Sequence, residues 1–111
     1  MDFTQEHLRP GVRRIQLIGT LDAPGAMSIE ETFISALTAE GGQVIIDLTQ
    51  TEYMSSYGLR MLLVGARELQ DSGGNLHLAG ASEAVMGVLQ MAGYDTMFPV
   101  YDTVDSALAS I

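Results

Sequence analysis

Residues 44–72 constrain the fold most strongly, because the apolar pattern there changes from that of a strand to that of a helix across a turn that contains two serines. The run at 44–46 is apolar and β-branched, which is typical of a strand buried on both faces of a sheet. Beyond the turn, apolar residues recur at spacings of three and four and predict a helix over 56–72. Its predicted buried stripe comprises Leu59, Leu62, Leu63, Ala66 and Leu69. Ser55 and Ser56 therefore lie at a helix N-terminus, where a hydroxyl can cap unpaired N–H groups and a phosphate is favoured electrostatically.

The remaining segments alternate between strands and helices after an initial hairpin. The predicted elements are antiparallel strands at 3–8 and 12–18, a helix from 24 that ends before Gly41, a strand at 43–47, the helix at 56–72, a strand through 76–78, a helix from 82 that ends at Gly93, a short strand near 97–101 and a last helix at 103–110. The first helix is expected to carry its apolar residues at Met27, Ile29, Phe33, Ile34 and Leu37. Alternating strands and helices favour parallel pairing with right-handed crossovers. The predicted fold class is therefore α/β, with one domain over 1–111, a mixed sheet of four or five strands, and helices packed mainly on one side.

Composition narrows the classes of partner. The formal net charge is −9 and all five cations are arginines, so phosphate backbones would be repelled and nucleic acid is not an expected partner. The absence of cysteine removes disulfides, thiolate metal sites and thiol nucleophiles, and fits an intracellular compartment. No apolar run approaches the ~20 residues that span a bilayer. The N-terminus lacks the pattern of a signal peptide. We therefore expect a cytoplasmic protein with no membrane insertion.

Metal and catalytic sites find little support in the residues. His7 and His77 are far apart in the sequence and have no third ligand at short spacing, so no metal is expected. The sequence has neither a nucleophile-elbow motif nor a phosphate-cradling loop of the Walker type. No catalytic residue and no cofactor are therefore predicted, and an enzyme is the least supported class of function.

The order of the elements, together with several short motifs, resembles the STAS domain family, particularly the bacterial anti-sigma-factor antagonists. The motifs are Gly19-Thr20-Leu21-Asp22, Asp47-Leu48, Tyr53-Met54-Ser55-Ser56-Tyr57-Gly58-Leu59, Gly73-Gly74 and Asp105-Ser106-Ala107-Leu108. In that family the turn typically reads Asp-Ser-Ser-Gly, and the serine before the glycine is phosphorylated by a partner that is both a serine kinase and an anti-sigma factor. Unphosphorylated antagonist binds that partner and frees the sigma factor. The resemblance covers nearly the whole chain and implies a non-catalytic regulatory module that binds a kinase-type anti-sigma factor. It also allows a phosphatase as a further partner.

The turn departs from the family pattern at the position where phosphorylation would act. Aligned on Gly58, Ser55 holds the aspartate position, Ser56 holds the first serine position, and Tyr57 holds the acceptor position. A phenol oxygen on a longer side chain would not lie where a serine kinase positions its hydroxyl. Either a neighbouring serine accepts the phosphate, with Ser56 the first candidate and Ser55 the second, or the domain escapes this switch.

The resemblance places a docking surface at the end of the strand before the first helix, at the serine turn and on the helix that follows. Its candidate residues are Asp22, Tyr53, Ser55, Ser56, Tyr57, Gly58, Arg60, Met61 and Val64. Met61 and Val64 lie off the predicted apolar stripe and are expected to be exposed. A second class of function is an unphosphorylated scaffold or transport-associated STAS subunit of a larger complex, which the missing acceptor serine favours.

Each of these residues also has a purely structural interpretation. A serine at the turn can act only as a helix cap, which contributes ~1 kcal/mol. Tyr53 and Tyr57 can be half-buried amphipathic side chains or exposed interface anchors. Asp22 and Asp47 stand at predicted strand ends, where they can cap turns or form a carboxylate pair beside the serines.

Overall fold

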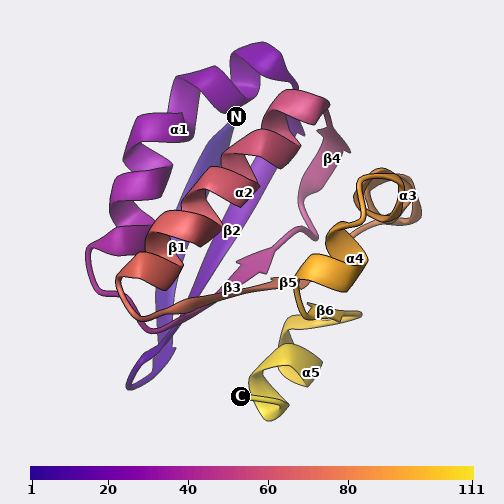
Figure 1. Ribbon diagram of the computed structural model, residues 1–111. Coiled ribbons are helices and arrows are strands. Elements are labelled where there is room, and N and C mark those ends of the chain that lie inside the picture. The colour runs from indigo at the N-terminus through magenta and orange to yellow at the C-terminus, as the bar shows by residue number, and fades with distance from the viewer.

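A mixed six-stranded sheet lies at the centre of the computed structural model, which describes residues 1–111 (Figure 1). The strands are β1 (Asp2–Arg9), β2 (Val12–Leu21), β3 (Gln43–Asp47), β4 (Thr51–Met54), β5 (Asn75–Ala79) and β6 (Val100–Tyr101). Their order is β1-β2-β3-β5-β6, with β4 paired to the C-terminal end of β2. The β1–β2 pair is antiparallel and every other pair is parallel. The continuous apolar run of residues 44–46 thus forms a central strand, as buried parallel strands require.

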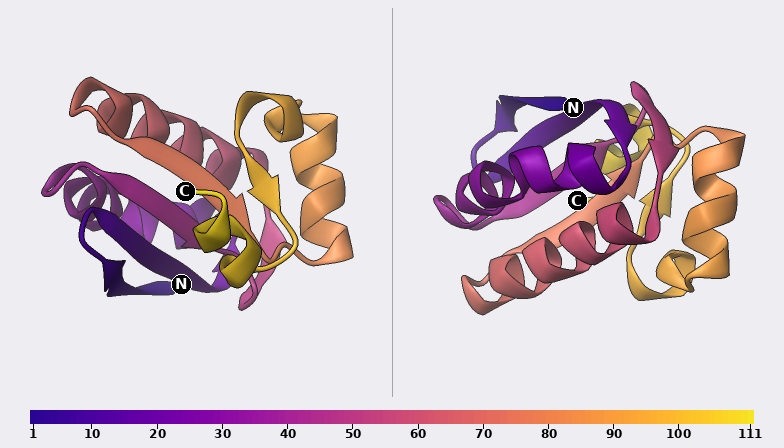
Figure 2. Two further views of the ribbon diagram at one scale, coloured as in Figure 1. Left: turned by 90° about the horizontal axis from the view of Figure 1, so that it is seen from below. Right: turned by 90° about the horizontal axis from the view of Figure 1, so that it is seen from above.

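The chain has five helices, of which the first four lie between strands and the last follows β6: α1 (Ala23–Thr38), α2 (Ser56–Asp71), α3 (Glu83–Met91), α4 (Tyr94–Met97) and α5 (Val104–Ala109). Side chains cap four of them, because Asp22, Ser55, Ser82 and Thr103 each accept a hydrogen bond from a backbone N–H of the first turn. Figure 1 shows α1 and α2 side by side over one face of the sheet. The views in Figure 2 show α3 beside this layer, at the end of the molecule where β4 lies.

The main core lies between the sheet and the layer of α1 and α2. It contains inward-facing residues of the central strands and of both helices, among them Ile15, Leu17, Val44, Ile46, Leu76, Leu78, Phe33, Leu37, Leu62 and Leu69. A smaller cluster on the opposite face joins Val12, Ile45 and Ala79 to Ala107 of α5. Helices therefore pack mainly on one side of the sheet, as predicted, and α5 is the exception.

Arg13 is a structural residue that the sequence patterns did not reveal. Its side chain is only 2% exposed and extends from β2 to the C-terminal end of α1. The guanidinium donates to the carbonyl oxygens of Ala36, Leu37 and Gly41 over 2.7–3.0 Å, and to Gln5 Oε1 over 2.7 Å. A cation at this position satisfies carbonyls that have no partner within the helix and complements the negative end of its dipole.

The α/β class and the mixed sheet are confirmed, with two elements more than the sequence predicted. The sheet has six strands instead of four or five, because β4 follows the turn after β3. In β4 the two terminal residues are buried and the two central ones exposed, so the alternation that identifies a strand is absent. The short helix α4 occupies the start of the segment predicted as a strand near 97–101, which contracts to β6.

The buried stripe of α2 is rotated from the predicted one. The buried residues are Gly58, Met61, Leu62, Gly65 and Leu69. The prediction that Met61 is exposed is wrong, since its side chain is completely buried, and Val64 is half-buried. The glycines explain the rotation. A Cβ at Gly65 would lie 2.6 Å from Leu37 Cδ1, so α1 comes closest to α2 at a glycine. A pattern drawn from large apolar side chains does not register a glycine.

Candidate functional site

Ser55 builds the turn that joins β4 to α2. Its backbone N–H and its Oγ both donate to the carbonyl oxygen of Leu21, each over 2.9 Å. The same Oγ accepts a hydrogen bond of 3.2 Å from the N–H of Gly58, which caps the first turn of α2. Because Leu21 ends β2, these three bonds hold the N-terminus of α2 at the C-terminal end of that strand. The predicted capping role of Ser55 is confirmed.

Gly58 allows α2 to approach the end of β2 closely. An added Cβ at this position would lie 2.7 Å from Leu21 Cγ and 2.9 Å from the Leu21 carbonyl oxygen. Real Cβ contacts are longer than this, so a side chain here would displace the strand or the helix. Gly58 is buried. It positions the turn and offers no side chain for a partner to contact.

Ser56 and Tyr57 differ in exposure although they are adjacent. Ser56 is exposed and its hydroxyl has no hydrogen-bond partner in the protein, whereas the hydroxyl of Ser55 has two. Tyr57 is half-buried and packs against the main core. The guanidinium carbon of Arg60 lies 5.8 Å from the centre of the Tyr57 ring, within reach of a cation–π contact. Tyr57 is therefore part of the framework of the turn as well as part of its surface.

Two helix N-termini meet at this end of the sheet. The β2–β4 register pairs Leu21 with Met54, so the residues that follow, Asp22 and Ser55, begin α1 and α2 at the same edge. Tyr53 lies beside them in β4 and is 52% exposed. We call the surface formed by Asp22, Tyr53, Ser56, Tyr57 and Arg60 the serine-turn face.

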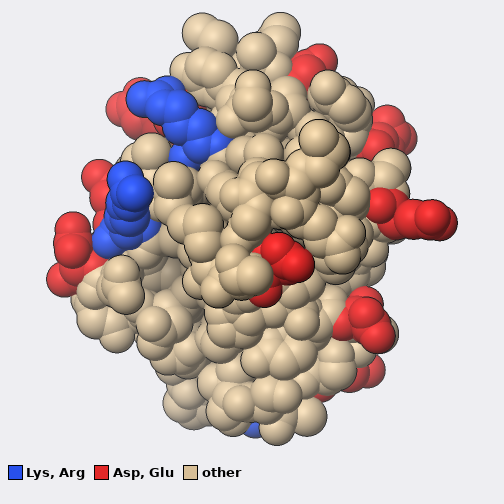
Figure 3. All heavy atoms as spheres, turned by 45° about the vertical axis from the view of Figure 1, so that its right-hand side comes forward, with Lys and Arg blue, Asp and Glu red and all other residues tan.

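Met27, which the sequence predicted on the buried side of its helix, lies in the first two turns of α1 and is 63% exposed. The prediction is wrong because α1 turns Ala26 and Ile29 toward the core, which directs Met27 outward. Figure 3 shows a face on which uncharged side chains predominate, with basic side chains gathered mainly at one side and acidic side chains at several places around the rim and near the centre.

Removing the cap should separate the roles of the two serines. We expect Ser55→Ala to lower the free energy of unfolding by about 1–2 kcal/mol, because it deletes the cap of α2 and the bond to Leu21. We expect Ser56→Ala to change it by no more than about 0.5 kcal/mol, because an exposed hydroxyl without a partner contributes little. Urea unfolding followed by circular dichroism measures both. Equal destabilisation by the two substitutions would contradict the assignment of the cap.

Asp47 and Asp22 each cap their own turn. Asp47 Oδ1 accepts hydrogen bonds from the N–H and the hydroxyl of Thr49, and its Oδ2 faces Gln16 at 3.1 Å and Arg14 at 3.7 Å. The Oδ1 of Asp22 accepts a hydrogen bond of 2.8 Å from the N–H of Gly25, in the first turn of α1. The capping interpretation of both carboxylates is confirmed. Histidine, aspartate and glutamate side chains form no group of three or more that could hold a metal ion. No helix is both long and apolar enough to cross a membrane.

The serine turn, its N-terminal cap and the strand order can be compared with those of known families. The family model of the STAS domain matches residues 5–107. The chain belongs to the STAS domain family. The resemblance inferred from the sequence motifs is thereby confirmed, and the match runs from β1 to α5. In the serine turn of this STAS domain, Tyr57 lies directly before Gly58.

Relatives of this STAS domain include proteins named as anti-sigma factor antagonists. BtrV of Bordetella bronchiseptica, named as an anti-sigma factor antagonist, is 29% identical over 94 residues, which are 85% of this chain and 81% of the relative. The crystal structure of an anti-sigma factor antagonist from Mycobacterium paratuberculosis is 27% identical, with a TM-score of 0.86 over 99% of this chain and 92% of that one. The anti-sigma factor antagonist SpoIIAA of Bacillus shares the fold in its unphosphorylated form, with 24% identity and a TM-score of 0.79 over 96% of this chain and 93% of that one. SpoIIAA has also been solved in a phosphorylated form.

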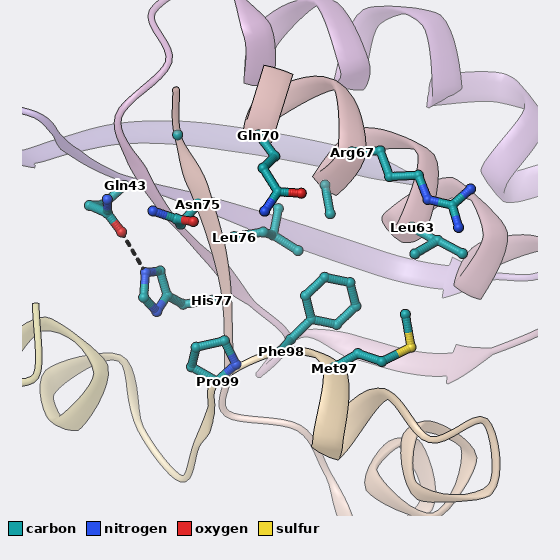
Figure 4. Close-up of a pocket in the computed structure, with 12 residues that line it drawn as sticks. Gln43, Leu63, Arg67, Gln70, Asn75, Leu76, His77, Met97, Phe98 and Pro99 are labelled. Carbon is teal, nitrogen blue, oxygen red and sulfur yellow. Dashed lines mark hydrogen bonds between the residues drawn. The ribbon is translucent and has the colours of Figure 1, made fainter. Parts of the chain in front are cut away.

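A groove of about 340 Å³ lies on another part of the STAS domain, between the C-terminal half of α2, the start of β5 and residues 97–99 (Figure 4). Its apolar lining includes Leu63 and Phe98, and its polar lining includes Arg67, Gln70 and Asn75. No motif in the sequence indicated this groove, because its residues come from four separate segments that have no shared spacing. At its inner end His77 Nε2 lies 2.7 Å from Gln43 Oε1.

His77 should make the stability of the domain depend on pH. Burial lowers the pKa of His77, and its Nδ1 is buried without a partner, so the folded state favours the neutral ring. The unfolded chain then binds the proton first as the pH falls, so the stability is fully present above the unfolded pKa of about 6.5 and is lost as the pH falls toward the folded value. We expect the free energy of unfolding to drop between about pH 7.5 and about pH 5.5, and to drop less in His77→Gln, which cannot titrate. Identical pH profiles for the two proteins would contradict this.

Proposed function

We propose that this STAS domain is an anti-sigma-factor antagonist that docks a kinase-type anti-sigma factor through the serine-turn face. The observation that carries the proposal is the exposed Ser56 hydroxyl, which lies without a partner at the capped N-terminus of α2, three residues after the exposed Tyr53. The likeness to BtrV and to the antagonist from Mycobacterium paratuberculosis supports the same conclusion. The domain acts by binding and carries no catalytic residue of its own.

The composition of the serine-turn face suits a protein contact. Interfaces are enriched in aromatic residues, methionine and arginine near their centre and are depleted of other charges. Tyr53, Met27 and Arg60 supply these residue types at one end of the molecule, all of them exposed. Met27 extends the docking surface beyond the residues indicated by sequence, whereas the buried Met61 cannot belong to it. Val64, half-buried on the third turn of α2, lies at the margin.

We further propose Ser56 as the residue that the kinase partner phosphorylates. Its hydroxyl is accessible and free, while that of Ser55 is held between Leu21 and Gly58. A phosphate on Ser56 would lie in the first turn of α2, where unpaired N–H groups and the helix dipole stabilise negative charge. It would also place about two negative charges on the docking face, which gives a physical means of weakening the complex.

Phosphorylation should therefore occur on Ser56. We expect peptide mass spectrometry, after incubation with the kinase-type anti-sigma factor and ATP, to find phosphate on Ser56 and to find none in Ser56→Ala. Ser55→Ala should still be modified, because it leaves the Ser56 hydroxyl in place. Phosphate on Tyr57, or on a distant serine such as Ser82, would refute the assignment. Absence of phosphate from a protein that binds the partner tightly would indicate an antagonist that escapes the switch.

Binding itself is tested by calorimetric titration against a kinase-type anti-sigma factor encoded beside the gene. We expect a stoichiometric complex and, when a sigma factor is already bound to the partner, its release on addition of this domain. A phosphatase encoded nearby would be the expected partner of the phosphorylated form. Failure to bind the anti-sigma factor, with stable incorporation into a transporter or another large complex, would favour a scaffold instead.

A further inference from the structure

The groove beside β5 contains polar side chains that have no partner in the protein. Arg67 forms none of the ion pairs of the molecule, and the side chains of Gln70 and Asn75 take part in no hydrogen bond. No acidic side chain lines the groove, although the chain as a whole carries a formal charge of −9. Figure 4 shows Gln70 and Phe98 facing the space between them from opposite walls. The groove is thus a locally cationic, donor-rich site in an acidic protein.

The strand at the base of the groove adds main-chain groups. β6 pairs only with Leu78 and Ala79, so the first half of β5 has no neighbour on its outer side. The N–H of Leu78 donates to Pro99 on that side, and alternate residues of a strand direct their main-chain groups to the same edge. The N–H and carbonyl of Leu76 therefore face the groove, beneath the apolar side chains of Leu63 and Phe98.

We propose that this groove binds a small organic monocarboxylate. Its carboxylate pairs with the Arg67 guanidinium, while its apolar part packs between Leu63, Ala66 and Phe98. The volume of about 340 Å³ lies near the lower end of the range of ligand pockets, which suits a molecule of modest size.

The geometry favours this ligand over two others. A partner strand needs a row of unpaired main-chain groups, but Gly74 already donates to Leu69 and Leu78 to Pro99, which leaves only Leu76. A phosphate carries close to two negative charges, and one arginine in a protein of charge −9 provides little compensation for them. A single carboxylate matches the planar fork of one guanidinium.

The site lies apart from the serine-turn face. Arg67 and Gln70 lie in the C-terminal half of α2, and at about 1.5 Å per residue Gln70 is roughly 21 Å along the helix from Ser56. The proposal therefore does not depend on the docking of an anti-sigma factor, and either can fail without the other.

Nuclear magnetic resonance titration tests the site, with phenylacetate as the probe and phenylacetamide as its uncharged control. We expect phenylacetate to cause saturable shifts of the amide signals of Gln70, Leu76 and His77, with those of Tyr53 and Ser56 unchanged. Arg67→Gln should bind roughly tenfold more weakly or worse, because it removes the charge-assisted hydrogen bonds to the carboxylate. Arg60→Gln, an equivalent change of an exposed arginine at the other end of the same helix, should bind as the parent does.

Three results would overturn the proposal. The first is equal binding of phenylacetamide, which would show that the carboxylate is not recognised. The second is equal binding by Arg67→Gln and the parent. The third is a set of shifts that does not saturate or that spreads over the whole surface, as expected for nonspecific contact alone.

Discussion

Gly58→Val is expected to destabilise the domain by about 3 kcal/mol, because the new side chain would overlap the end of β2. Even its Cβ would lie 2.7 Å from Leu21 Cγ and 2.9 Å from the Leu21 carbonyl oxygen. The carbonyl is main chain and also accepts the two hydrogen bonds from Ser55, so it cannot move without opening the turn. Urea unfolding measures the loss, and the denaturant midpoint should fall with little change in slope.

Gly87→Val is the matched control for this substitution. Gly87 also lies in a helix, but a Cβ there would have no atom within 4 Å. The intrinsic helix propensities of valine and glycine differ by only a few tenths of a kcal/mol, so we expect a change within about 0.5 kcal/mol. If both variants lose the same stability, the close approach of α2 to β2 is not what Gly58 provides.

Tyr53→Asp is expected to weaken binding of the anti-sigma factor by roughly thirtyfold or more while the domain stays folded. Loss of an aromatic anchor typically costs ~2 kcal/mol or more, and desolvation of the new carboxylate adds to this. Tyr53 is suited to the test because it is 52% exposed in β4, whereas Tyr57 packs against the core and its replacement would also disturb folding. Calorimetric titration measures the affinity, and circular dichroism verifies the fold.

Thr4→Asp is the matched control for charge. It introduces the same carboxylate at an exposed position of β1, another strand of the sheet, and leaves the serine-turn face intact. We expect its affinity for the anti-sigma factor to equal that of the parent. If Tyr53→Asp binds as tightly as Thr4→Asp, the exposed ring is not an anchor. If both bind weakly, the effect comes from net charge and not from a specific contact.

The alternation of apolar patterns was sufficient to predict most of the fold. The β-branched run at 44–46 indicates a strand that is buried on both faces of the sheet. The apolar spacing of three and four beyond residue 56 indicates a helix with one buried face. Both patterns can be read from a short stretch of sequence. β4 could not be found in this way, because its two central residues are exposed and its sequence shows no alternation. It is a strand because it pairs with the end of β2 that extends past β3. Its pairing is a property of the assembled sheet.

The position of the candidate site could be predicted from the sequence, but the separate roles of Ser55 and Ser56 could not. The helix N-terminus at the serines followed from the pattern, yet only the structure shows that Ser55 forms the cap and that Ser56 remains free. The prediction placed Met61 on the surface because the buried stripe of the helix was defined by its leucines, without the glycines that lie on the same side as Met61. The closest helix contact instead follows Gly58 and Gly65, where small residues let Leu21 and Leu37 approach.

The docking proposal is tested most directly by amide hydrogen exchange of this domain, measured by mass spectrometry with and without the kinase-type anti-sigma factor. Exchange should slow in peptides that cover residues 20–28 and 53–60, which carry the exposed side chains of the serine-turn face and of Met27. Peptides from β1, α5 and the groove beside β5 should be unaffected. Protection confined to β1, α5 or the groove, with none at residues 53–60, would contradict the account.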